Sequence, residues 1–327
     1  MGTRFHRRQL LGMGLAASAW PLMGHAQATW PTKPVTTVVP FPAGGGTDAF
    51  ARPFSGAFTK LTGQNLILDY RGGAGGTVGA SIAAKAAPDG YTFFMGAVHH
   101  AIAPAMYPKL DYDLERDFVP LALMASVPFV LVVNPQKVTA PDFKGFLAQV
   151  RSSPGRMNFA SAGNGTAHQM AGELFKLQTK TFITHIPYRG AGPALQDLMA
   201  GNVEMMFDGL GSSAQHIKSG RIKALMVAGA QRNPAFPDVP CAAELGLKDY
   251  NVSTWYGLWA PKGTPAAVQT AMLDVIKKAR ETPEVKTAWA NSGAEFPPVS
   301  PAQFAELISA ETKRWAGVVK ASGAKLD

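Results

Sequence analysis

The most constraining segment of the chain is Val38–Asp48, which reads VVPFPAGGGTD. A short apolar run leads into Pro-Phe-Pro and three consecutive glycines, and Thr47-Asp48 then opens a segment with helical periodicity. We expect a strand, a glycine turn and a helix, with Thr47 or Asp48 as the helix N-cap. The backbone N–H groups at such a turn can hold an anion without a basic side chain.

Residues 1–28 have the organisation of an export signal. Three arginines precede an uncharged run, Leu10–Met23, and the segment ends in the small residues Ala26-Gln27-Ala28. This run is too short to cross a bilayer, which needs about 20 apolar residues. The pair Arg7-Arg8 resembles a twin-arginine signal, and the general secretion route also stays open. We expect cleavage after Ala28 or Ala26 and a mature protein in the periplasm.

Composition narrows the range of partners. Beyond residue 28 the chain keeps 28 Lys and Arg against 22 Asp and Glu, a net charge of +6, and these charges are spread evenly. No basic block with interleaved aromatics is present, so we do not expect nucleic-acid binding. Cys241 is the only cysteine, which excludes an intramolecular disulfide and a thiolate metal cluster. Thr29 stands where a lipoprotein would carry its cysteine, so we expect no lipid anchor.

Strands and helices alternate through the first part of the chain. We expect strands at Val35–Val39, Leu66–Tyr70 and Tyr91–Met95, and helices at Thr47–Thr62 and Thr77–Ala87. This β-α-β-α-β order predicts a parallel, doubly wound sheet. Ligands on such sheets bind beyond the carboxyl ends of the strands, where the turns 40–46 and 71–76 would both lie.

The second part repeats this alternation. An uncharged segment, 118–136, contains three prolines and is predicted to be a buried strand over Val127–Val133 and not a membrane span. The other expected strands are Asn158–Ala160, His185–Pro187, Met205–Phe207, Ile222–Val227 and Asn251–Trp259, and the expected helices are Asp142–Ser152, Thr166–Gln178, Ala191–Gly201 and Ser213–Ser219. We expect domain 1 at 29–130 and 251–327, an inserted domain 2 at 131–250, and a hinged cleft between them.

Several motifs follow one another in a fixed order: WPTKPVTTVVPFPAGGGTD, RGGAGGTVGA, PDGYTFFMG, NFASAGNGTAHQMAGELF, HIPYRGAGPALQDLMAG, MMFDG, STWYGLWAPKGTP and WAGVVKASG. In these motifs the chain resembles the extracytoplasmic solute receptors of tripartite tricarboxylate transporters, the Bug receptor family. The resemblance implies a two-domain α/β periplasmic receptor of the venus-flytrap type (type II). It also implies a monomer without catalysis or cofactor, which hands a small carboxylate to an inner-membrane permease. Dicarboxylates, tricarboxylates, amino acids and aromatic acids all stay open as ligands.

The resemblance also places the ligand carboxylate between two turns, one from each domain. The ligand-binding residues it implies are Phe41, Ala43, Gly44, Gly45, Thr47 and Asp48 in the first turn and Ser161, Gly163, Asn164, Gly165, Thr166 and His168 in the second, with His99, Arg189 and Asp208 at the border of the cleft. Glycines without Cβ atoms allow close approach of a carboxylate, and a helix N-terminus adds about half a positive charge.

Some of these residues have a second interpretation. His168 suits a structural hydrogen bond as well as a ligand contact, and Arg189 suits a surface position or a salt bridge as well as a distal carboxylate. His99 and His100 are not expected to bind metal, because no HExxH pattern accompanies them and adjacent side chains in an extended loop point apart.

Three other classes of function were weighed against the receptor. A periplasmic carboxylate sensor that docks to a signalling protein stays open. An exported serine hydrolase is the weaker interpretation, because Gly-x-Ser-x-Gly is absent around Ser161. A P-loop enzyme would need a lysine after the glycines, where Thr47-Asp48 stands.

Overall fold

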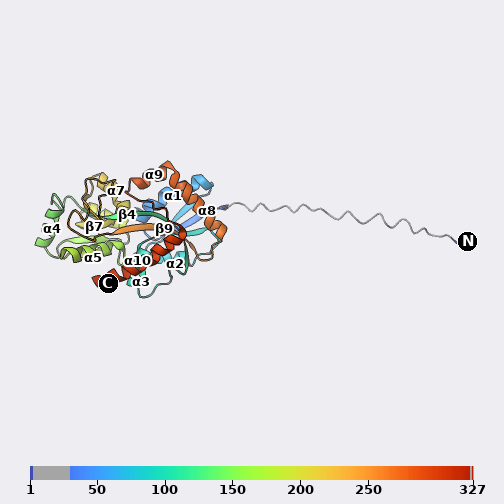
Figure 1. Cartoon of the computed structure of the whole chain (residues 1–327), viewed down its shortest axis with the longest axis horizontal. Coiled ribbons are helices and arrows are strands. Elements are labelled where there is room, and N and C mark those ends of the chain that lie inside the picture. Colours follow the sequence, from blue (N-terminus) through green and yellow to red (C-terminus); the bar gives the residue numbers. More distant parts are fainter. Residues whose placement is uncertain (3–29, 325, 327) are drawn as a thin grey trace.

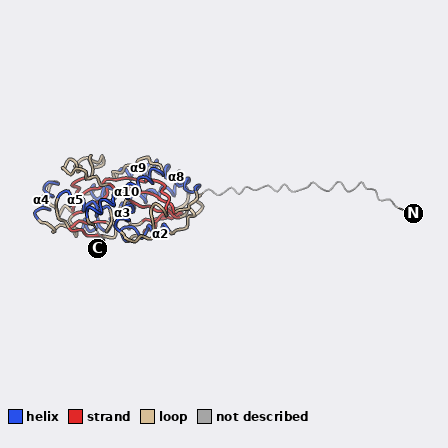
Figure 2. Tube along the Cα trace, turned by 60° about the horizontal axis from the view of Figure 1, so that its bottom comes forward, coloured by secondary structure: helices blue, strands red, loops and turns tan. Residues whose placement is uncertain are grey.

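The computed structural model describes residues 1–2, 30–324 and 326. The expected export signal lies outside the described residues. Within the described part, no helix is both long and apolar enough to cross a membrane. Figure 1 shows an elongated molecule with α4 (Phe143–Ser152) and α5 (Ala167–Thr179) at one end and α2 (Thr77–Ala84) and α8 (Ala266–Glu281) at the other, and Figure 2 shows the same separation.

The described strands form one connected sheet in the order β2-β1-β3-β9-β4-β7-β5-β6, with β8 paired to β4. Their bounds are β1 Val35–Val39, β2 Leu66–Tyr70, β3 Thr92–Ala97, β4 Phe118–Val133, β5 Asn158–Ser161, β6 Thr184–Pro187, β7 Met205–Gly209, β8 Lys223–Val227 and β9 Ser253–Pro261. The pairs of β1 with β2 and β3 are parallel, as the alternation predicted, and so are the pairs of β5 with β6 and β7. All pairs that involve β4 or β9 are antiparallel, which the sequence did not predict.

Strand β4 is much longer than the predicted strand over Val127–Val133. It begins at Phe118 and joins the two ends of the sheet, because its first part pairs with β9 and its last part with β7 and β8. Two of the prolines that argued against a membrane span, Pro120 and Pro128, lie inside the strand opposite β9. A proline lacks the N–H donor of a ladder, and the register shifts directly after Pro120.

Two lobes follow from this sheet. The first lobe carries β1–β3 with α1 (Gly46–Thr62), α2, α3 (His99–Met106), α8 and α9 (Pro283–Ala290); the second carries β5–β8 with α4, α5, α6 (Ala191–Ala200) and α7 (Leu210–Lys218). Strands β4 and β9 run between them, and α10 (Pro301–Ser322) contacts α3, β4 and α5. Helix α2 ends at Ala84, three residues before its predicted end, and α3 occupies a segment expected to be an extended loop.

Helices cover both faces of the sheet, as a doubly wound arrangement requires. On one face, alternate residues such as Val38 and Leu131 pack against α2, α3, α4, α5 and α10. Their neighbours Val39 and Val132 pack on the opposite face against α1, α6, α7, α8 and α9. Period-two alternation along the strands therefore builds two apolar cores that each extend through both lobes.

Candidate functional site

A pocket of about 350 Å³ lies between the two lobes. The first lobe contributes Phe41, Tyr107 and a glycine turn, and the second lobe contributes the ends of β5 and β6. The lining residues are Phe41, Gly73, Ala74, Gly75, Tyr107, Ala162, Gly163, Asn164, Pro187, Tyr188, Arg189 and Leu326. Four predicted ligand residues, Phe41, Gly163, Asn164 and Arg189, thus meet at one pocket beyond the carboxyl ends of parallel strands.

Sequence reasoning left several lining residues out of the predicted set. Gly73–Gly75 belong to the glycine turn 71–76, and Tyr107 lies at the C-terminal end of α3. The signal for the glycines was available, because this turn follows β2 as the first turn follows its neighbour β1. Tyr107 carried no such signal, since only the fold brings the C-terminal end of α3 to this place.

The first turn is organised differently from the prediction that Thr47 or Asp48 caps α1. The N-cap is Gly45, with extended φ and ψ of −90° and 176°. Asp48 lies in the first helical turn and its Oδ2 accepts the Gly44 N–H at 2.9 Å, which holds Gly44 at a φ of 84°. The buried Asp48 carboxylate also accepts hydrogen bonds from Arg52 and from the Tyr70 hydroxyl. Burial, reinforced by this bond, raises the pKa of Tyr70 to about 12.

Helix α1 points its N-terminus at the second lobe. Gly45 packs against the start of α6, because a Cβ added at Gly45 would lie 3.7 Å from Ala191 Cβ and from the Gly192 nitrogen. At Gly192 the fit is tighter, since an added Cβ would lie 2.6 Å from the Ala43 carbonyl oxygen. The first N–H groups of a helix have no partner within the helix, and the partial positive charges of α1 and α6 therefore meet at the junction of the lobes.

The second turn has fewer free amides than the glycine pattern suggested. The Gly163 N–H donates to Ser161 Oγ at 3.0 Å, the Gly165 N–H to Gln169 Oε1 at 2.8 Å, and the Thr166 N–H to the Gly163 carbonyl at 3.3 Å. Thr166 is the N-cap of α5, but its hydroxyl donates to the Gly163 carbonyl and accepts no hydrogen bond from the helix. These bonds fix the shape of the turn.

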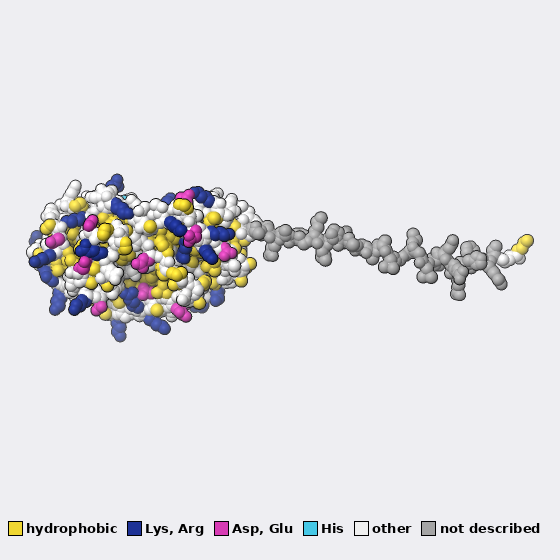
Figure 3. All heavy atoms as spheres, turned by 45° about the horizontal axis from the view of Figure 1, so that its top comes forward, with side chains coloured by type: hydrophobic (Ala, Val, Ile, Leu, Met, Phe, Trp, Pro, Cys, Tyr) yellow, Lys and Arg dark blue, Asp and Glu magenta, His cyan; other side chains and the backbone are white. Residues whose placement is uncertain are grey.

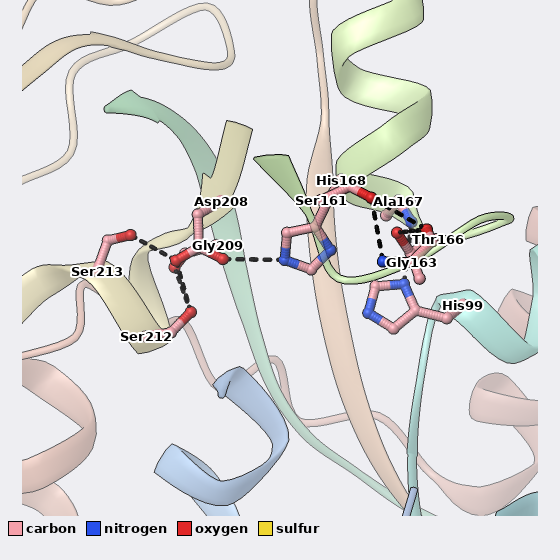
Figure 4. Close-up of polar contacts among 10 residues, drawn as sticks. All are labelled: His99, Ser161, Gly163, Thr166, Ala167, His168, Asp208, Gly209, Ser212 and Ser213. Carbon is pink, nitrogen blue, oxygen red and sulfur yellow. Dashed lines mark hydrogen bonds and ion pairs between the residues drawn. The ribbon is translucent and has the colours of Figure 1, made fainter. Parts of the chain in front are cut away.

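His168 and Asp208 form a buried, hydrogen-bonded pair beneath the second turn. His168 Nε2 lies 2.9 Å from Asp208 Oδ1, and Ser212 and Ser213 donate their hydroxyls to Asp208 Oδ2 (Figure 4). Both side chains are almost inaccessible and neither lines the pocket. In this structure His168 makes a structural hydrogen bond, which is one of the two roles considered for it. Its Nδ1 atom is buried without a partner.

His99 and His100 are on a helix, so the expectation of an extended loop was wrong. His99 Nδ1 accepts the Ala167 N–H at 3.0 Å, a contact from the first lobe to the second turn (Figure 4). His100 Nδ1 faces the Ala97 backbone and its Nε2 lies 3.3 Å from the Gly76 carbonyl. Burial lowers the pKa of His99 well below its usual value and that of His100 to about 4. Among the described residues, no three His, Cys, Asp or Glu side chains are grouped as metal ligands.

The charge at the pocket comes from one side chain. Of the described residues that line it, only Arg189 is charged; this arginine is exposed and takes part in none of the ion pairs of the described residues. Elsewhere, basic and acidic side chains are intermixed over the face drawn in Figure 3. An anion in the pocket would therefore meet one guanidinium and backbone groups, because the Tyr107 and Tyr188 hydroxyls already donate to the Asn164 carbonyl and to Asp197.

Comparison with known proteins gives a consistent result. Residues 50–324 match the model of the tripartite tricarboxylate transporter family receptor. The chain is 36% identical over 300 residues to the protein BugT of Bordetella pertussis, which covers 91% of this chain and 92% of BugT. It is similar in structure to the periplasmic binding protein BugD, with a TM-score of 0.87, 30% identity, and coverage of 90% and 99% of the two chains.

Two similar structures contain dicarboxylates. MatC from Rhodopseudomonas palustris with bound malate aligns with a TM-score of 0.83 and 36% identity, covering 88% of this chain and 99% of MatC. A second R. palustris protein, with adipate, aligns with a TM-score of 0.86 and 33% identity, covering 91% of this chain and all of that protein.

Proposed function

Because the chain belongs to the receptor family of the tripartite tricarboxylate transporters, we propose that it binds a small dicarboxylate between its two lobes and delivers it to a membrane permease of that class. The family is periplasmic, and residues 1–28 would direct the export of this member. The observation that carries the proposal is the pocket of about 350 Å³ at the lobe junction, lined by both lobes and by a single charged side chain.

Two kinds of group would hold the two carboxylates. One carboxylate would lie where the N-termini of α1 and α6 adjoin the pocket at Phe41 and Arg189, because the helix dipoles favour negative charge there. The other would meet Arg189, whose planar guanidinium suits a bidentate pair with a carboxylate. Pocket volumes of roughly 300 to 1,000 Å³ are usual for small-molecule sites, so four- to six-carbon acids are suitable candidates. The malate and adipate in two similar structures support this size range.

The lobes are also arranged to respond to a ligand. Tyr107 Oη donates to the Asn164 carbonyl at 2.9 Å and the Ala167 N–H donates to His99 Nδ1 at 3.0 Å, so both bonds join the first lobe to the second turn. A carboxylate held by groups from both lobes would favour the arrangement in which these bonds are made. A permease could then distinguish the loaded receptor by the relative position of the lobes.

A hydrolase is not favoured, although the structure brings a serine and a histidine together. Ser161 Oγ lies 2.6 Å from His185 Nε2, but Ser161 is fully buried and also bonds to Gly163. A nucleophile must reach its substrate, and this hydroxyl does not line the pocket. The carboxylate sensor would use the same pocket, so it differs from the transport receptor only in its partner.

A thermal-shift screen of the mature protein tests the binding step. The panel consists of malate, adipate, citrate, aspartate and benzoate. A ligand at 100 times its Kd adds about 2.7 kcal/mol to the free energy of unfolding, and we expect the largest shift for malate or adipate. Absence of a shift with every acid would contradict the proposal.

The delivery step needs a separate assay in cells. Uptake of the labelled acid should fall when this receptor is deleted and recover with the wild-type chain. Unchanged uptake, together with a lost transcriptional response to the acid, would favour the sensor.

A further inference from the structure

A second pocket, of about 440 Å³, lies in the first lobe between β4, α8 and the segment that follows α9. It shares no lining residue with the pocket between the lobes. Its lining residues are Leu121, Ala122, Leu273, Ile276, Lys277, Arg280, Glu281, Lys286, Trp289, Phe296, Pro298 and Val299.

Arg280 is the unusual residue of this pocket. Its Nη2 donates to the Leu123 carbonyl, at the position where the pairing of β4 with β9 shifts register before Ala125. Its Nε–H is buried without an acceptor, and the salt bridges of the described residues give it no acidic partner. A buried charge is normally paired, because taking a guanidinium out of water is costly.

The other charges leave the pocket positive. Lys277 and Lys286 add to Arg280, whereas Glu281 is the one acidic side chain and already pairs with Lys286 at 2.7 Å. Burial lowers the pKa of Arg280. An anion that enters the pocket would therefore find an uncompensated guanidinium.

The remaining wall is apolar. Phe296 stacks on Trp289 with ring centroids 5.0 Å apart and an angle of 20° between the planes, and Leu273, Ile276 and Val299 complete the surface. A ligand with a large polar body would lose its hydration there without replacement hydrogen bonds.

We propose that this pocket is a second anion site, which binds a small monocarboxylate with an apolar body through Arg280. The carboxylate would pair with the guanidinium, and the apolar body would lie against Phe296 and the aliphatic side chains. A second, chemically different acid would then bind to the first lobe without displacing a ligand from the pocket between the lobes.

The test uses 3-phenylpropionate as the probe and NMR of the mature protein as the readout. The indole signal of Trp289, assigned with a Trp289→Phe variant, should shift in a saturable manner. In Arg280→Gln the affinity should fall at least about tenfold, since a charge-assisted pair is lost. Arg156→Gln makes the same chemical change at an exposed arginine of the second lobe and should leave the affinity unchanged. The uncharged analogue 3-phenylpropionamide should bind at least about tenfold more weakly than the acid.

Two further variants keep the outcomes distinct. Leu273→Trp fills the pocket while Arg280 is retained, so it should abolish the shift of the Trp289 signal. This variant tests the proposal if Arg280→Gln does not fold. Gly45→Val alters the junction of the lobes, so it should weaken the binding of malate and leave the binding of 3-phenylpropionate unchanged. Equal binding of acid and amide, unchanged binding in Arg280→Gln or Leu273→Trp, or loss of the probe in Gly45→Val would each overturn the proposal. If malate bound to none of the variants, this result would contradict the proposed role of the pocket between the lobes and would not bear on the second anion site.

Discussion

His99 of the first lobe accepts the backbone N–H of Ala167 in the second lobe, at 3.0 Å through Nδ1. The bond requires an unprotonated Nδ1, and the buried ring has no acidic neighbour that would favour the charged form. His100 is likewise neutral, because Nδ1 accepts the Ala97 N–H and an Nε2–H can donate to the Gly76 carbonyl. The contact between the lobes therefore depends on a neutral His99, whereas the bonds of His100 lie within the first lobe.

The first prediction is a loss of stability in acid. The folded-state pKa values lie below the usual 6.5, well below for His99 and at about 4 for His100, so the unfolded chain takes up protons first. Stability from these groups is complete above pH 6.5 and decreases as the pH falls from 6.5 toward 4. Between pH 6.5 and 4.5, His100 alone should remove about 2 to 3 kcal/mol. Urea unfolding at both pH values measures this, with the double variant His99→Asn/His100→Asn as control. An equal loss in that variant would assign the pH effect to other groups.

The second prediction concerns the junction of α1 and α6. Gly192→Ala places a Cβ 2.6 Å from the Ala43 carbonyl oxygen, so the lobes must move apart. Small-angle scattering should give a larger radius of gyration, and malate should bind more weakly. Gly45→Ala is the matched control, because its Cβ meets only ordinary contacts of 3.7 Å. If both variants have the wild-type radius, the contact does not limit the approach of the lobes.

The third prediction uses a pair of tyrosines. Tyr107→Phe removes the hydrogen bond to the Asn164 carbonyl, which should cost about 0.5 to 1.5 kcal/mol and weaken malate binding about two- to tenfold. Tyr112 also has a buried hydroxyl, but this hydroxyl has no partner. Tyr112→Phe should therefore leave stability unchanged or raise it. Calorimetry and thermal unfolding of both variants test the comparison, and equal effects would show that the Tyr107 bond contributes nothing specific.

The fourth prediction concerns the buried carboxylate of Asp208. The Asp208 carboxylate accepts hydrogen bonds from Ser212, Ser213 and His168. An asparagine side chain has one oxygen fewer, so it cannot accept all of them. Asp208→Asn should lower the free energy of unfolding by at least about 2 kcal/mol, whereas the exposed Asp274→Asn should have little effect. Chemical denaturation of the two variants gives the difference. A stable Asp208→Asn protein would mean that the buried charge is not needed for folding.

The fold was accessible from the sequence where local signals agree with tertiary structure. Strand β2 and the starts of α2 and α6 lie at their predicted positions, because apolar alternation, Gly and Pro mark them locally. Strand β4 was underestimated, because its prolines oppose local strand formation and only the pairing with β9 overrides them. The segment at His99 gave no clear helical pattern, and its helix is stabilised by packing against α10.

The candidate site was only partly accessible for a similar reason. Glycine turns are visible in the sequence, so Gly163 and Asn164 were found, whereas Tyr107 reaches the pocket only through the position of α3. The hydrogen bonds that occupy the amides of Gly163, Gly165 and Ala167 depend on Ser161, Gln169 and His99, and no pattern along the chain indicates those pairs. Gly45 has a φ of −90°, which any residue adopts, and an added Cβ would meet ordinary contacts of 3.7 Å.

The central claim is that helix N-termini at the lobe junction provide the main hold on a dicarboxylate, with Arg189 in a secondary role. Calorimetric titration of malate into Gly45→Val and Arg189→Ala tests it most directly. The branched side chain at position 45 would block the N-terminus of α1 against Ala191, and loss of two charge-assisted hydrogen bonds should weaken binding at least about a hundredfold. Arg189→Ala should weaken it less, about tenfold. Normal binding by folded Gly45→Val together with abolished binding by Arg189→Ala would contradict the account.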